Sequence, residues 1–314
     1  MAEMTSASPE PLALVGESLR ELGAELTALR LIDLHPAPSP FTTGFRTRFP
    51  ERTEPAFPTA LAAWERVAQL AGEGGVVFVA GPAQSVVVEG FPLFRRLVAR
   101  HRPTVKLVTT DGGWTGSDPP VLEDLALIQG APGVTVVVPG DHSTAQSGLK
   151  AVGRMEGPAY VRLAPDLPAP LAPAPFELGR ARELREGRDL TIAAVGPPIA
   201  LAWRTAEELG RVGLSARVLD CASLAPFDEK AILRAARDTG ALLTIEDHQA
   251  ATGLGARVAT LTAENFPVPV RRLGSPDLFG LSTGPEAGRA ELGLTVESAL
   301  EEAWELLRLK GKVQ

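Results

Sequence analysis

The sequence is poor in cysteine, in aromatic residues and in positive charge. Cys221 is the single cysteine in 314 residues, which excludes an intrachain disulfide framework and a cysteine-rich zinc site. The net charge of −7 is opposite in sign to the balance typical of nucleic-acid-binding proteins. Long apolar runs are missing, so we expect no membrane-spanning helix. The first residues lack the basic and apolar segments of a secretory signal, and we therefore expect a cytoplasmic chain whose residues 1–9 form a loose tail.

Several motifs that would identify a cofactor or a reaction are also missing. Neither a Gly-x-Gly-x-x-Gly fingerprint nor a P-loop occurs where a first strand would meet a first helix. His35, His101 and His142 fall in separate predicted loops and lack the spacing of metal ligands, so we predict no metal site.

What the sequence has is a regular alternation of short apolar runs and helical patterns. The hydrophobic share of 45% is enough for two cores. The alternation of strands with helices predicts an α/β fold with two domains, each with a mainly parallel sheet covered by helices. The predicted strands are residues 31–34, 76–80, 105–109, 134–138 and 159–163, then 190–195, 216–219, 241–245 and 269–273.

A proline-rich stretch near the middle of the chain divides the two series of strands. Residues 164–179 have the composition of a stiff, extended linker. We therefore predict a first domain over residues 10–165, a linker over 166–187 and a second domain over 188–314. A shorter stretch rich in Pro and Thr, residues 36–43, is predicted to be a loop.

One glycine pair could serve a binding site. Gly253 and Gly255 follow a predicted strand and the acidic tripeptide that ends in His248. They would let a helix N-terminus approach an anion, or they would allow tight packing of the helix on the strand. His248, beside two carboxylates, is either an acid–base group or a structural or interface residue, and the second interpretation is favoured.

The order of several segments resembles the C-terminal half of transketolases. Residues 122–127, 132–141 and 157–163 are similar to their pyrimidine-binding domain. Four later segments are similar to their C-terminal domain: residues 176–196, 224–233, 239–255 and 275–286. The resemblance extends over nearly the whole chain from about residue 10 and implies a thiamine-diphosphate-binding, pyrimidine-type domain followed by a transketolase C-terminal-like domain.

In that family, thiamine diphosphate sits between two subunits, and a separate diphosphate-binding domain holds the phosphates and Mg²⁺. That domain would precede this sequence. The resemblance therefore implies the second subunit of a split transketolase, with thiamine diphosphate and Mg²⁺ bound only together with an N-terminal partner chain. It also implies a homodimer, because pyrimidine-binding domains bury a large surface against neighbouring chains.

The sequence departs from the family where the pyrimidine ring would bind. The position of the activating glutamate aligns with Ala60, counted without gaps both from residues 45–52 and from residues 76–80. The family's Phe-Ala-x-Phe becomes Pro82 to Ser85, and the histidine of its Ser-His-Ala-Gly becomes Asp111. We therefore predict a degenerate pyrimidine site at Ala60, Pro82, Ser85 and Asp111, without a catalytic residue.

Three functions remain open at this point. The favoured one is a structural or regulatory partner of a thiamine-binding chain, inactive by itself. The second is an active subunit that transfers a two-carbon ketol unit between sugar phosphates with a substitute acid. The third is a small-molecule binding module built on the same scaffold.

Overall fold

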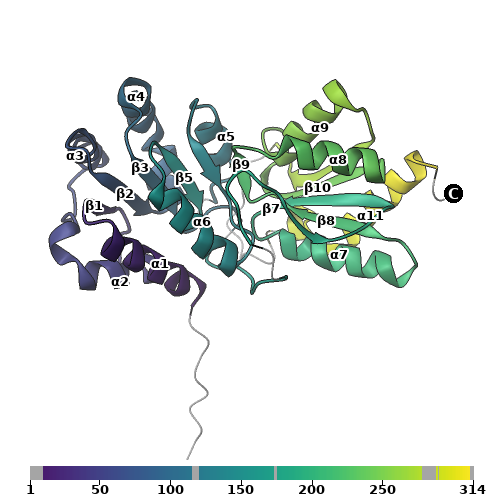
Figure 1. Cartoon of the computed structure of the whole chain (residues 1–314), viewed down its shortest axis with the longest axis horizontal. Coiled ribbons are helices and arrows are strands. Elements are labelled where there is room, and N and C mark those ends of the chain that lie inside the picture. Colours follow the sequence, from purple (N-terminus) through teal and green to yellow (C-terminus); the bar gives the residue numbers. More distant parts are fainter. Residues whose placement is uncertain (1–9, 115–119, 173–174, 278–287, 289, 312–314) are drawn as a thin grey trace, which may run out of the picture.

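The computed structural model describes residues 10–114, 120–172, 175–277, 288 and 290–311 (Figure 1). The predicted tail over residues 1–9 and most of the segment from 275 to 286 lie outside these residues. The described chain forms two sheets flanked by helices, which confirms the predicted α/β fold with two mainly parallel sheets.

The first sheet has six strands in the order β1-β2-β3-β5-β4-β9. All neighbours are parallel except β9, which pairs antiparallel with β4. The strands are β1 (Leu29–Asp33), β2 (Val76–Gly81), β3 (Val105–Thr109), β4 (Thr135–Val137), β5 (Ala159–Arg162) and β9 (Ser223–Ala225). The helical elements of this half are α1 (Pro11–Glu25), α2 (Pro40–Arg48), η1 (Pro50–Arg52), α3 (Ala60–Gly72), η2 (Gln84–Val88), α4 (Phe91–His101), α5 (Asp124–Gln129) and α6 (His142–Arg154).

The second sheet has five strands in the order β11-β10-β7-β8-β6, in which only the edge strand β6 is antiparallel. Its strands are β6 (Arg182–Arg185), β7 (Leu190–Val195), β8 (Ala216–Asp220), β10 (Leu242–Gln249) and β11 (Val270–Ser275). The helices of this half are α7 (Ile199–Arg211), α8 (Glu229–Thr239), α9 (Leu254–Asn265) and α11 (Val296–Leu309).

Side chains of each central strand point alternately to two different cores, as a sheet covered on both faces requires. In β2, Val77 and Val79 pack with α3, α4 and α5, whereas Phe78 and Ala80 pack with α1, α2 and α6. In β7, Ile192 faces the core under α7 and α11. Continuous apolar runs such as residues 76–80 therefore form strands that are buried on both sides.

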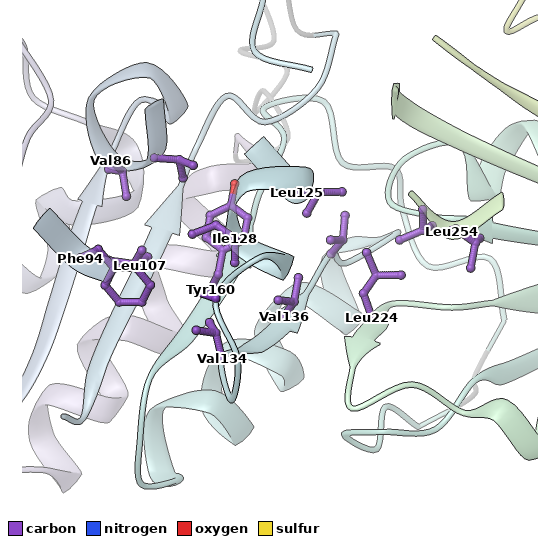
Figure 2. Close-up of a cluster of buried hydrophobic side chains, with 14 of the residues drawn as sticks. Val86, Phe94, Leu107, Leu125, Ile128, Val134, Val136, Tyr160, Leu224 and Leu254 are labelled. Atoms are coloured by element: carbon purple, nitrogen blue, oxygen red, sulfur yellow. The ribbon is translucent and has the colours of Figure 1, made fainter. Parts of the chain in front are cut away.

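The core that covers one face of the first sheet continues into the second half of the chain. Figure 2 shows Phe94 and Leu107 at one end of this cluster and Leu224 and Leu254 at the other, with Val136 between them. All five side chains are fully or almost fully buried. Because one apolar core spans both halves, the halves are held against each other by the hydrophobic effect.

One local prediction was wrong. Residues 40–48 form helix α2, although the stretch from Pro36 to Thr43 was predicted to be a loop. Ser39 caps this helix through its hydroxyl, and Pro40 follows as its first residue, which is a favourable helix start. Strand β6 lies within residues 166–187, the predicted linker, and its Arg182 is almost completely buried. The proposed domain boundaries stay a prediction.

Candidate functional site: a pocket beside Ala60 and a closed cluster around Glu246

A pocket of about 370 Å³ opens at the carboxyl ends of β1 and β2. Two of the predicted site residues, Ala60 and Ser85, line it together. Ligands of parallel α/β sheets bind at this edge, because the loops after the strands meet there. The other lining residues are Asp33, Leu34, His35, Pro36, Ala56, Phe57, Pro58, Thr59 and Glu89.

Ala60 is the first residue of α3 and is exposed to solvent. The Thr59 hydroxyl caps the helix by accepting a hydrogen bond from the backbone N–H of Ala62, at 3.2 Å. The first turn of α3 carries no acidic side chain. The helix therefore presents its N-terminus to the pocket without a carboxylate in its first turn.

The structure adds a polar cluster that the sequence did not predict. The His35 ring lies between the Asp33 carboxylate, 2.6 Å from Nδ1, and the Thr110 hydroxyl, 2.8 Å from Nε2. Thr42 and Arg46 of α2 also donate to Asp33. Burial raises the pKa of Asp33, but the hydrogen bonds from His35 and Thr42 outweigh burial and hold that pKa below its usual value. An ionised Asp33 thus fixes the orientation of His35 at the wall of the pocket.

Pro82 and Asp111 lie together, but neither lines the pocket in the described structure. The Asp111 carboxylate accepts a hydrogen bond from the backbone N–H of Ala83, at 2.6 Å. Burial raises the pKa of Asp111, and the hydrogen bond from Ala83 only partly offsets this. Asp111 therefore ties the end of β3 to the turn after β2. Of the four predicted pocket positions, Ala60 and Ser85 line the pocket, and Pro82 and Asp111 do not.

The predicted site at His248, Gly253 and Gly255 is assembled around Glu246, which is fully buried. The Glu246 carboxylate accepts hydrogen bonds from the backbone N–H groups of Leu254 and Gly255, at 2.7 and 2.8 Å. The N-terminus of α9 is thus already occupied by a carboxyl group that belongs to the chain. A Cβ on Gly253 would lie 1.9 Å from both Glu246 Oε2 and His248 Nε2, so a glycine is required for this close approach.

Burial dominates the electrostatics of this cluster. It raises the pKa of Glu246 to about 8, against the two backbone N–H groups that favour the carboxylate. It lowers the pKa of His248 to about 3, with a further contribution from the nearby Arg162. The His248 side chain is fully buried and its Nε2 lies 3.2 Å from Glu246 Oε2, although neither ring nitrogen forms a hydrogen bond among the described residues. A role for these residues in binding an external anion or another subunit stays a prediction.

Buried polar bridges join the two halves of the chain near these sites. Arg182 donates to Asp141 of the first half at 2.7 Å and to Asp220 of the second half at 2.6 Å. Arg162 of β5 donates to the backbone carbonyl of Asp247 at 3.0 Å. These bridges lie beside the shared apolar core and fix the orientation of one half against the other.

The comparisons with known proteins agree with this arrangement. The sequence profile of the transketolase C-terminal domain matches residues 179–298, a range that includes the cluster around Glu246 but not the pocket beside Ala60. A putative transketolase C-terminal section from Methanocaldococcus jannaschii is 31% identical over 93% of this chain and 95% of its own length. The chain belongs to the transketolase family.

Other members of the transketolase family support the same placement. A 6-deoxy-6-sulfo-D-fructose transketolase subunit from Clostridium sp. (strain MSTE9) is 37% identical over 66% of this chain and 66% of its own length. A solved structure described as a split gene transketolase, inactive beta4 tetramer, has a TM-score of 0.88 and 31% identity, and covers 97% of this chain and 100% of the other. The chain thus corresponds to the C-terminal part of a transketolase.

Three further properties of the described residues concern membranes, metals and the cysteine. Over the described residues, no helix combines the length and the apolar character needed to cross a bilayer. Within the same residues, no three or more His, Cys, Asp or Glu side chains are grouped so that they could hold a metal ion. Cys221 is a buried free cysteine whose pKa is raised by burial, so its thiol is not poised to react.

Proposed function

We propose that this chain is the C-terminal subunit of a split transketolase whose own pyrimidine site no longer activates thiamine, so that it serves as a structural or regulatory partner of a thiamine-binding chain. The observation that carries the proposal is Ala60. It lines the pocket at the start of α3, where the family has a glutamate that hydrogen-bonds the aminopyrimidine ring.

The residues around the pocket fit the cofactor poorly. The two carboxylates of the lining are Asp33, already engaged by His35, Thr42 and Arg46, and the exposed Glu89. The turn after β2 offers Pro82 and Ser85 where the family places aromatic faces. Thiamine diphosphate and Mg²⁺, if present in the complex, would then be held by the partner chain, and this chain would contribute surface rather than the activating acid.

One observation favours the second candidate, an active subunit. The pocket is open rather than filled by neighbouring side chains, and the His35 imidazole, held by an ionised Asp33, lies at its wall. This candidate requires His35 to replace the glutamate. The third candidate, a small-molecule binding module, is supported only by the presence of the pocket.

We also propose that the chain associates with itself and with an N-terminal chain that carries the diphosphate-binding domain. The relatives described as subunits and as a tetramer support this.

Reconstitution tests the proposed function directly. The chain is purified from its native cell under mild conditions, and co-purifying proteins are identified by mass spectrometry. We expect a partner with a diphosphate-binding domain. The isolated chain, supplied with thiamine diphosphate, Mg²⁺, xylulose 5-phosphate and ribose 5-phosphate, should show no ketol transfer. If the reconstituted complex is active and His35→Ala abolishes that activity while the complex stays intact, the active-subunit candidate replaces the one proposed here.

A further inference from the structure

The segment that follows β3, residues 110–114, contacts strand ends in both halves of the chain, and we call it the arm. Its first two residues bond to the loops after β1 and β2, both of which contribute lining residues to the pocket. The Thr110 hydroxyl lies 2.8 Å from His35 Nε2, and the Asp111 carboxylate accepts a hydrogen bond from the Ala83 N–H at 2.6 Å. The start of the arm therefore touches the pocket wall and the turn after β2.

The last two residues of the arm bind to the second half. The Trp114 N–H donates to the Asp247 carboxylate of β10 at 2.9 Å, and the Trp114 side chain is buried in the core of the second sheet. Gly113 has a φ of 85°, and a Cβ there would lie 2.8 Å from Asp247 Oδ2, so a glycine is required. The returning chain is tied to the same strand, since the Gln249 N–H donates to the Leu122 carbonyl at 3.2 Å.

Asp247 lies where sheets of this topology ordinarily bind a ligand. The chain passes from β7 to β8 on one side of β7, whereas β10 pairs with β7 on the other side. Glu246 is paired with Val195, the last residue of β7, so Asp247 stands at the carboxyl ends of both strands. Such a switch point is the usual ligand crevice of a parallel α/β sheet. In this chain, the arm of the first half is bound at that place.

The middle of the arm is closely packed against a buried arginine. The Gly112 N–H donates to the Leu163 carbonyl at 3.0 Å, and a Cβ on Gly112 would lie 2.3 Å from Arg162 Cγ. Arg162 in turn donates to the backbone carbonyl of Asp247 at 3.0 Å. Close packing leaves the middle of the arm little freedom, so a displacement at one end moves the other end as well.

We propose that Trp114 and Asp247 are positioning residues of the pocket: the second half of the chain holds the arm, and the arm holds His35 and the turn after β2 in place. Neither residue lines the pocket, so both act through Thr110 and Asp111. This goes beyond the proposed function, because it gives the second half a task that is the same whether or not the pyrimidine site is active.

The first test observes His35 directly, by NMR of the full chain with isotope-labelled histidine. The chain has four histidines, so the ring signals can be assigned by substitution. Thr110→Val removes the hydroxyl beside His35 Nε2 and defines the displacement of the His35 signals when that contact is lost. Asp247→Ala removes the acceptor of the Trp114 N–H and should displace the His35 signals in the same direction. Asp247→Asn keeps an oxygen for that N–H and should restore the wild-type positions.

Asp189→Ala is the matched control for Asp247→Ala. Asp189 is a buried residue of the second half whose carboxylate also accepts a backbone N–H, from Ser215 at 2.7 Å, but it lies at the amino end of β7, away from the arm. The His35 signals should keep their wild-type positions in this variant. Unchanged His35 signals in folded Asp247→Ala, or equal displacement in both alanine variants, would overturn the proposal.

A second pair of variants tests the tryptophan and decides the matter if Asp247→Ala does not fold. Trp114→Phe and Trp304→Phe each shorten a tryptophan that packs in the same core. Only Trp114→Phe should displace the His35 signals, and circular dichroism of both variants checks that they fold. Equal effects of the two substitutions, or no effect of Trp114→Phe, would contradict a positioning role of Trp114.

Hydrogen exchange in the wild-type chain gives a check that needs no substitution. The Trp114 amide should exchange as slowly as the amides in the middle of β10, because it is buried and bonded to that strand. Rapid exchange at Trp114 would show that the second half does not hold the arm. None of these measurements depends on ketol transfer: transfer by the isolated chain would refute the proposed function and leave the result for His35 intact.

Discussion

The pocket beside Ala60 lies at the ends of β1 and β2, and the cluster around Glu246 lies on β10, yet the two sites differ greatly in how open they are to solvent. The pocket is bounded by exposed and half-buried side chains, and Ala60 itself is exposed. The Glu246 cluster is fully buried, with two glycines held against a carboxylate. A substitution in an open pocket changes function at little cost in stability, whereas a substitution in the closed cluster disturbs the fold. Under the proposed function, this difference accounts for the retention of the family pattern around Glu246 and its loss beside Ala60.

The largest effect is expected from Gly253→Ala. The new Cβ would overlap Glu246 Oε2 and His248 Nε2, both within a buried site that has little room to relax. We expect the free energy of unfolding to fall by about 3 kcal/mol or more, or the chain not to fold. Gly72→Ala is the control, since a Cβ there meets nothing within 4 Å. Chemical denaturation of both variants measures the difference. Equal stability would mean that the cluster is as open as the pocket.

A smaller, pH-dependent effect is expected from Asp220→Asn at the junction between the halves. Burial raises the pKa of Asp220 to about 6, and Arg182 only partly offsets this. When a carboxyl group has a higher pKa in the folded chain than in the unfolded chain, its protonated form stabilises the fold. This contribution to the free energy of unfolding is full at a pH below the pKa in the unfolded chain, and it is lost as the pH rises through the pKa in the folded chain. The wild type should therefore lose about 2 kcal/mol relative to the variant between about pH 4.5 and 8.

Thermal melts across that range measure the effect of Asp220→Asn. Asp238→Asn serves as the control, because Asp238 is exposed and forms only a surface ion pair with Arg217. A stability difference between wild type and Asp220→Asn that does not change with pH would show that Asp220 stays ionised throughout.

The smallest effect on stability is expected from Ala60→Glu. The site is exposed at the first position of a helix, where a carboxylate is favourable by about 0.3–1 kcal/mol. The free energy of unfolding should change by no more than about 1 kcal/mol, and ketol transfer with a competent partner should stay undetectable. Ala60→Gln is the uncharged control. Gain of ketol transfer by the glutamate variant alone would show that the rest of the pocket is competent and would end the proposal of a degenerate site.

The strands and the location of Ala60 were predictable from local sequence patterns, but polar contacts between residues far apart in the sequence were not. The apolar runs predicted both sheets, because strands buried on two faces leave a continuous signal. Ala60 was predicted to be a pocket residue by counting from two nearby segments of the sequence, and in the structure it lines the pocket. His35 was assigned to a loop without a function, since one of its partners, Thr110, is 75 residues away. Only the Asp-x-His spacing at the end of a predicted strand could have indicated it. Ser39 and Pro40 are a typical start of a helix and could have predicted α2. The other prolines nearby led to the prediction of a loop instead.

The three-residue strand β9 has a consequence for the order in which the chain can fold. It comes from the second half of the sequence and pairs with β4, where it is the last strand of the first sheet. During synthesis, residues up to 165 therefore emerge with the edge of β4 still unpaired, and the sheet is completed only after residue 225 has left the ribosome. Unpaired strand edges recruit other strands. A gene fragment that ends in the proline-rich stretch would then yield a sheet with a permanently open edge, so the two halves are not interchangeable parts that can be expressed separately.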